Sequence, residues 1–178
     1  MVEEQIDWRK TVEAILENAN RPFVPISKSF IQQPRGSKER SSVLSQFVTN
    51  GDLRGLKAYL LIAASASSPD TENEWYTSLP LQTWARAFGC SETAGSIATA
   101  KAAATRILLR LQQRGLIEKS RCGKERKIKI KLLAQDGSGE EYQRPASRYI
   151  RLSHDFWKSR FDEDISLPAL AMFLVVLG

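Results

Sequence analysis

The feature that most constrains the fold of this chain is a change of hydrophobic period at Gly115. Before this glycine, apolar residues recur at the spacing of one helix face, namely Ala104, Ile107, Leu108 and Leu111. After it, Leu116 begins a strand, and residues 126–133 alternate charged and apolar side chains, which is typical of a half-exposed strand. Residues 122–125 have the composition of a turn. The sequence therefore predicts a helix followed directly by a β-hairpin.

Further elements are expected upstream of this helix. Asp52 is suited to cap a helix over residues 53–66, and Gly89 to end a helix that begins at Pro80. A brief strand is expected at 75–79. A longer helix is predicted from Ser91, as its cap, to about Arg114. The predicted order is thus helix, strand, helix, helix, hairpin.

Two segments carry a resemblance to a known family: Leu81 to Gly89, and Ala104 to Lys119 with its helix–Gly–Leu–Ile–charged step. In this order of elements they resemble the winged helix-turn-helix family over residues 53–133. The resemblance implies a mainly α fold with a small β-hairpin wing (α+β class) and a double-stranded-DNA-binding function. One departure is the long link from Gly89 to Ala104, so the third helix is either extended at its start or preceded by an extra turn.

Four regions are expected along the chain. Residues 1–22 contain an amphipathic helix, predicted over 5–19 and capped by Asp7. Residues 23–134 form the winged-helix domain, which includes a polar loop at 33–42. Residues 135–148 are a polar linker. Residues 149–178 begin a possible second, truncated copy and end in an apolar C-terminal helix.

The second copy is inferred from an internal echo. Residues 23–31 match residues 149–157 at an offset of 126 positions, and the apolar residues 56–62 match 170–176 at an offset of 114. This layout is similar to that of plasmid and phage replication initiators, which carry two winged-helix domains. The alternative is that both apolar helices are ordinary core helices and the match is accidental.

Positive charge is concentrated in the predicted recognition helix and wing. Residues 99–134 contain 11 Lys or Arg and two Glu, a net charge of +9, whereas the whole chain carries +6. The rest of the chain is therefore net acidic. A local basic surface of this kind is expected of a protein that binds phosphates.

The predicted recognition helix has two faces. We expect Ile97, Ala104, Ile107, Leu108 and Leu111 to pack into the domain, and the small residues Ala100 and Ala103 to lie on the exposed front with the polar residues. The candidate DNA-binding residues are Ser96, Thr99, Lys101, Thr105, Arg106, Arg110, Arg121, Lys124, Arg126 and Lys127. For the strand lysines, including Lys129 and Lys131, the alternative is a solvated strand that discourages edge pairing. Trp84 is expected in the core.

Several function classes are not supported. The sequence has two cysteines and one histidine, which argues against a disulfide framework or a zinc site. It has no glycine-rich phosphate loop. We therefore expect no enzyme, no metal and no cofactor. The acidic start without an apolar stretch, and a longest apolar run well below the roughly 20 residues of a membrane span, predict a cytoplasmic protein with no membrane partner.

Three hypotheses for function remain open. The first is a replication-initiator-type protein that binds duplex DNA. The second is a transcriptional regulator that binds a palindromic operator as a homodimer, associating through residues 5–19 or the C-terminal helix. The third is a winged helix that binds another protein and makes no contact with DNA.

Overall fold

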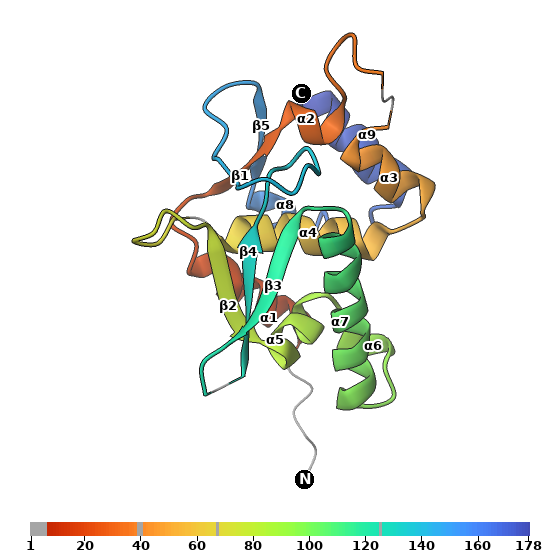
Figure 1. The fold of residues 1–178 in the computed structure, drawn as a ribbon. Coiled ribbons are helices and arrows are strands. Elements are labelled where there is room, and N and C mark those ends of the chain that lie inside the picture. The colour runs from red at the N-terminus through yellow and green to blue at the C-terminus, as the bar shows by residue number, and fades with distance from the viewer. Residues whose placement is uncertain (1–6, 39–40, 67, 125) are drawn as a thin grey trace.

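The computed structural model describes residues 7–38, 41–66, 68–124 and 126–178. Within these residues the chain forms nine helices and five strands (Figure 1). The helices are α1 (Trp8–Glu17), α2 (Lys28–Ile31), α3 (Val43–Thr49), α4 (Leu53–Ser65), α5 (Leu81–Ala87), α6 (Cys90–Thr93), α7 (Ile97–Gln113), α8 (Asp155–Lys158) and α9 (Leu167–Leu177). The strands are β1 (Phe23–Ser27), β2 (Tyr76–Pro80), β3 (Ile117–Cys122), β4 (Lys127–Leu132) and β5 (Tyr149–Ser153).

Two small antiparallel sheets organise these elements. One has three strands in the order β2-β4-β3, and the other pairs β1 with β5. The expected strand at 75–79 and the expected hairpin are both present. The combination of helices with small antiparallel sheets is compatible with the predicted α+β class. Among the described residues, no helix has the length and apolar character that a membrane crossing requires.

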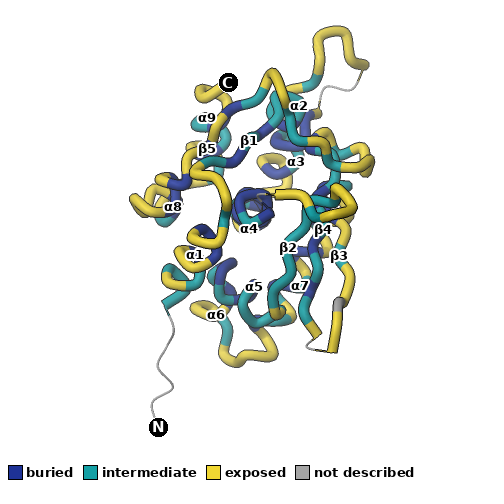
Figure 2. The backbone as a smooth tube through the Cα atoms, turned by 90° about the vertical axis from the view of Figure 1, so that its left-hand side faces the viewer, coloured by how far each residue is buried: buried dark blue, intermediate teal, exposed yellow. Residues whose placement is uncertain are grey.

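Helix α4 forms the centre of the molecule. Figure 2 shows it end-on, surrounded by the other elements. Most of its residues are buried, with Leu56 and Tyr59–Ile62 almost fully so, and Arg54 is its only exposed residue, as expected for a helix enclosed by its neighbours. The predicted helix over 53–66 and its cap are confirmed: a carboxylate oxygen of Asp52 accepts a hydrogen bond from the Gly55 amide at 3.0 Å. Trp84 is buried in the core, as expected.

The predicted continuous helix from Ser91 is wrong in its first part. The short helix α6 ends at Thr93, and Ala94 takes an extended conformation with ψ at 138°. Helix α7 then starts after Ser96, whose hydroxyl accepts from the Thr99 amide at 3.1 Å. The capping hydroxyl of Ser96 and the break beside Gly95 start a new helix there. Of the two alternatives for the long link, the structure has the extra turn.

The N-terminal region also differs in detail from expectation. The helix predicted over 5–19 is present as α1, with the Asp7 carboxylate accepting from the Arg9 amide at 3.0 Å; positions 5 and 6 lie outside the described residues. The sequence did not predict α3. Ser42 caps this seven-residue helix, and it buries Val43, Leu44 and Phe47.

The two segments of the internal echo pair with each other. Phe23 lies opposite Ser153, and Ser27 lies opposite Tyr149. A twofold rotation about the pair Pro25–Arg151, at the centre of the two strands, therefore exchanges Phe23 with Tyr149, the two residues that the echo matches. The paired segments lie on either side of the expected linker at 135–148. Residues 23–27 and 149–153, expected in separate regions, therefore belong to one sheet. The matched helices are covered differently: α4 is enclosed, whereas Met172 and Val176 of α9 are 60% and 77% exposed.

Candidate nucleic-acid interface

Helix α7 presents one face to the core and one to solvent. The core stripe consists of Ala100, Ala104, Ile107, Leu108 and Leu111. The predicted faces are wrong at two positions. Ala100 is buried rather than exposed, because it lies on the same stripe as Ala104. Ile97 is 50% exposed, because it lies in the first turn, where the core stripe is no longer covered.

The outward stripe of α7 combines small residues with one long cation. Thr99, Ala102, Arg106 and Leu109 are all exposed and recur at helical spacing. The Arg106 side chain makes no hydrogen bond or ion pair with any described residue. The Thr99 hydroxyl lies 2.9 Å from the Ser96 hydroxyl. Ala102 and Leu109 were not among the predicted contact residues; the phase of the helix, fixed by its core stripe, was the signal that could have indicated them.

Two further predicted residues flank this stripe. Lys101 and Thr105 are half-buried and lie on one side of the helix. The Thr105 hydroxyl donates to the Lys101 carbonyl at 2.9 Å, so this hydroxyl is used within the helix.

Arg110, a predicted contact residue, is bound within the fold although its side chain is 40% exposed. Its guanidinium donates to both carboxylate oxygens of Asp52, from Nε at 3.0 Å and from Nη2 at 2.9 Å. Arg114 donates to the same carboxylate at 2.8 Å and lies 4.3 Å from the centre of the Phe47 ring. Burial by itself raises the pKa of Asp52, but hydrogen bonds from Arg110 and Arg114 outweigh it and lower that pKa. The C-terminal half of α7 is therefore held against the start of α4.

The hairpin of β3 and β4 places its cations on two opposite faces. Residues directly opposite in an antiparallel pair share a face, and Lys119 and Arg121 lie opposite Ile130 and Ile128. Because these isoleucines are buried, Lys119 and Arg121 lie on the side of the core and α7. Lys119 was not predicted as a contact. Residues 127, 129 and 131 alternate with the isoleucines and lie on the outer face.

The outer-face lysines have acidic partners in the fold. Lys129 and Lys131 donate to the two carboxylate oxygens of Glu74 at 2.9 and 2.7 Å. These bonds, first that from Lys131, lower the pKa of Glu74 to about 2. Lys129 also lies 4.1 Å from the centre of the Tyr76 ring. The alternative that these lysines protect a sheet edge is wrong, because β4 is the central strand of its sheet.

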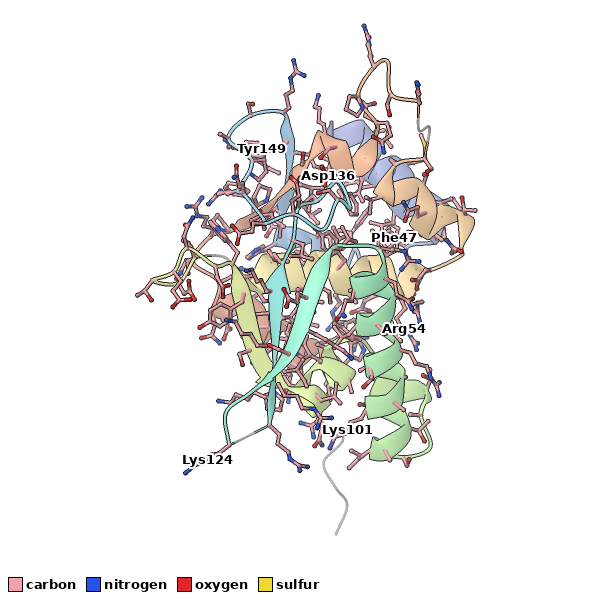
Figure 3. All side chains as sticks on the ribbon, in the orientation of Figure 1. Phe47, Arg54, Lys101, Lys124, Asp136 and Tyr149 are labelled. Carbon is pink, nitrogen blue, oxygen red and sulfur yellow. The ribbon has the colours of Figure 1, made fainter. Side chains whose placement is uncertain are left out.

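The hairpin tip and the beginning of α7 lie at the same end of the molecule. Figure 3 shows Lys124 at the tip and Lys101 near the start of α7, both at this end. Lys124, Arg126 and Arg121 are exposed. Gly123, with φ at 71°, forms the turn. Of the predicted site residues, Lys101 and Lys124 are seen at this end of the molecule, Thr105 is bonded within α7, Lys127 lies on the outer face and Arg110 is bound to Asp52.

Comparisons with models of protein families, with curated proteins and with solved structures find no match. The functional argument therefore depends on the geometry of this chain.

Proposed function

We propose that this protein binds double-stranded DNA as a winged helix-turn-helix, with the first half of α7 in the major groove and the β3–β4 hairpin on the phosphate backbone. The observation that carries the proposal is the outward stripe of α7, which is small at Thr99 and Ala102 and then carries Arg106, at the same end of the molecule as an exposed basic hairpin tip. This role requires no catalytic group and no cofactor.

Size and reach favour the major groove. The groove is about 12 Å wide and admits one helix. Small side chains at 98, 99 and 102 let the helix axis approach the base edges, while Arg106 is long enough to pair with guanine or a phosphate. The N-terminus of α7 lies at the end of the molecule that carries the hairpin tip. A helix N-terminus favours contact with phosphate oxygens.

The connectivity also supports the resemblance to winged helices. The order α4, β2, α5, α7, β3, β4, with β4 between the other two strands, matches the order of elements that the resemblance implies. The short helix α6 is an addition within this order.

For the biological role we propose a replication-initiator-type protein rather than an operator-binding regulator. The observation that favours this choice is the pairing of the two echo segments as β1 and β5, with matched positions exchanged across the ladder. Such pairing is expected where two copies of one unit adjoin.

The test is fluorescence anisotropy of a labelled random duplex with the full chain at two salt concentrations. We expect binding with a dissociation constant on the order of micromolar that weakens steeply as salt rises, because bound cations release counterions. A Lys124→Gln/Arg126→Gln variant should bind more weakly than a Lys10→Gln/Lys158→Gln variant, which removes the same charge from two exposed sites on α1 and α8. Absence of binding at low salt would contradict the proposal and favour a protein-interaction module.

A further inference from the structure

The β1–β5 sheet has an outer face that differs in chemistry from the rest of the surface. Along β1, Val24 and Ile26 are buried while Phe23 faces outward; along β5, Ile150 and Leu152 are buried while Tyr149, Arg151 and Ser153 face outward. The register places Arg151 opposite Pro25, between the two outward rings. Aromatic and cationic groups therefore share one face of this sheet.

These groups form a ladder of alternating cations and rings. The Arg151 guanidinium lies 5.1 Å from the centre of the Phe23 ring and 6.0 Å from that of Tyr149. The Arg144 guanidinium also lies near the Phe23 ring, 5.8 Å from its centre. Arg151 thus contacts both Phe23 and Tyr149, and Phe23 has a second cation beside it. Each step is within the range of a cation–π contact.

The charge of this ladder is not neutralised by the fold. Among the described residues, Arg144 and Arg151 form no ion pair, and neither do the neighbouring Arg21 and Arg148. The acids close in sequence have other partners: Glu141, three residues before Arg144, lies 3.8 Å from the Lys131 ammonium, and Asp155, four residues after Arg151, accepts a hydrogen bond from the Ser153 hydroxyl at 3.1 Å. The surface is thus cationic, in contrast to the outer face of β4, where Glu74 binds both lysines.

The ladder is separate from the proposed duplex interface. Figure 3 shows Tyr149 at the end of the molecule opposite Lys124, and Figure 1 shows β1 and β5 on the far side of α4 from the β3–β4 tip. A straight duplex held by α7 and the hairpin tip does not reach this sheet.

We infer that the outer face of the β1–β5 sheet is a second binding site, and that its ligand is single-stranded nucleic acid. Unpaired bases expose flat π faces that stack on aromatic rings and on guanidinium planes, and the strand's phosphates pair with the same arginines. A duplex hides its base faces inside the stack and offers this sheet only its backbone. The alternation of rings and cations on an outward sheet face therefore fits single-stranded nucleic acid better than a duplex.

The experiment measures binding of the full chain to a labelled oligothymidine of about 15 nucleotides, in parallel with a duplex of equal length. The test variant is Arg144→Gln/Arg151→Gln, and the control is Lys10→Gln/Lys158→Gln, which has the same net charge. We expect the test variant to bind the oligothymidine about tenfold more weakly, and the duplex within about twofold of the unaltered chain. The control variant should bind both the oligothymidine and the duplex within about twofold of the unaltered chain.

A second variant separates stacking from charge. Tyr149→Leu keeps an apolar side chain on the strand and removes the ring, so a fall of about threefold or more in oligothymidine binding, with an unchanged thermal unfolding midpoint, supports stacking. Equal loss of both ligands in the arginine variant, an equal loss in its control, or unchanged oligothymidine binding would overturn the inference. The site does not depend on the proposed duplex interface. Arg106→Ala should therefore weaken duplex binding and leave oligothymidine binding unchanged. If the unaltered chain binds oligothymidine but no duplex, only the proposed function is overturned.

Discussion

Asp52 binds Arg110 in a two-point ion pair, with both donor–acceptor distances close to 3 Å. The same carboxylate caps α4 through the Gly55 amide. One buried side chain therefore sets the start of the central helix and the position of the helix proposed to enter the DNA groove. Gly55 is required beside it, because a Cβ there would lie 2.6 Å from the Asp52 carboxyl carbon.

Removal of this carboxylate should destabilise the whole fold. Asp52→Ala loses a helix cap and leaves Arg110 and the largely buried Arg114 without their acceptor, so we expect the free energy of unfolding to fall by about 2–4 kcal/mol. Asp52→Asn keeps a capping oxygen and should lose roughly half as much. Urea unfolding followed by circular dichroism measures both. Equal losses in the two variants would mean that the ion pairs contribute little.

The Asp52 ion pairs should also make stability depend on pH. Because the pKa of Asp52 is lower in the folded chain than its ordinary value of about 3.9, the carboxylate stabilises the fold fully above about pH 4 and loses this effect as pH falls through the lowered pKa. The difference in unfolding free energy between the native chain and Asp52→Asn should therefore shrink below pH 4. A difference that stays constant down to pH 2 would contradict the lowered pKa.

Arg106 is expected to contribute to sequence discrimination. Its side chain is exposed on the outward stripe and has no partner among the described residues. Arg106→Ala should cost about 1–3 kcal/mol on a duplex selected from a random pool, and less on random duplex, if this side chain pairs with a base edge. Competition binding of both duplexes measures the ratio. An identical loss on both would reduce Arg106 to a phosphate contact.

The two faces of the hairpin should behave differently in salt titrations. Lys119→Gln/Arg121→Gln changes the face shared with α7, and Lys129→Gln/Lys131→Gln removes the same charge from the outer face. Removing one cation that binds a phosphate reduces the steepness of the negative slope of log K against log salt by about 0.9. We expect a shallower slope for the first variant and an unchanged slope for the second. The reverse result would place DNA on the outer face.

Local signals explain why part of this structure was predictable. The caps made by Asp52 and Asp7 and the turn at Gly115 involve residues within a few positions, and the period-two alternation of β4 reflects only which of its own side chains are buried. By contrast, Arg110 meets Asp52 at a separation of 58 residues and Lys129 meets Glu74 at 55. Neither pairing leaves a periodic pattern in one sequence, so these cations looked unpaired. Helix α3 was missed because seven residues are too few to establish a period.

Asp162 offers a second pH effect, opposite in sign to that of Asp52. It is 7% exposed, and burial raises its pKa to about 6, although its own backbone amide and the nearby Lys57 act in the other direction. Between about pH 4 and pH 6 the folded chain therefore holds a proton on Asp162 that the unfolded chain has released, so stability falls as pH rises through this window.

Asp162→Asn removes this titration while keeping the shape of the side chain. The variant should match the native chain near pH 4 and become more stable than it by about 1–3 kcal/mol near pH 7. Asp164→Asn, at an exposed neighbouring position, is the control and removes the same charge. Unfolding midpoints measured across this pH range decide the matter: if the gain of Asp162→Asn is the same at pH 4 and pH 7, the buried carboxyl is not protonated in the folded chain, and contact with Lys57 must hold it ionised.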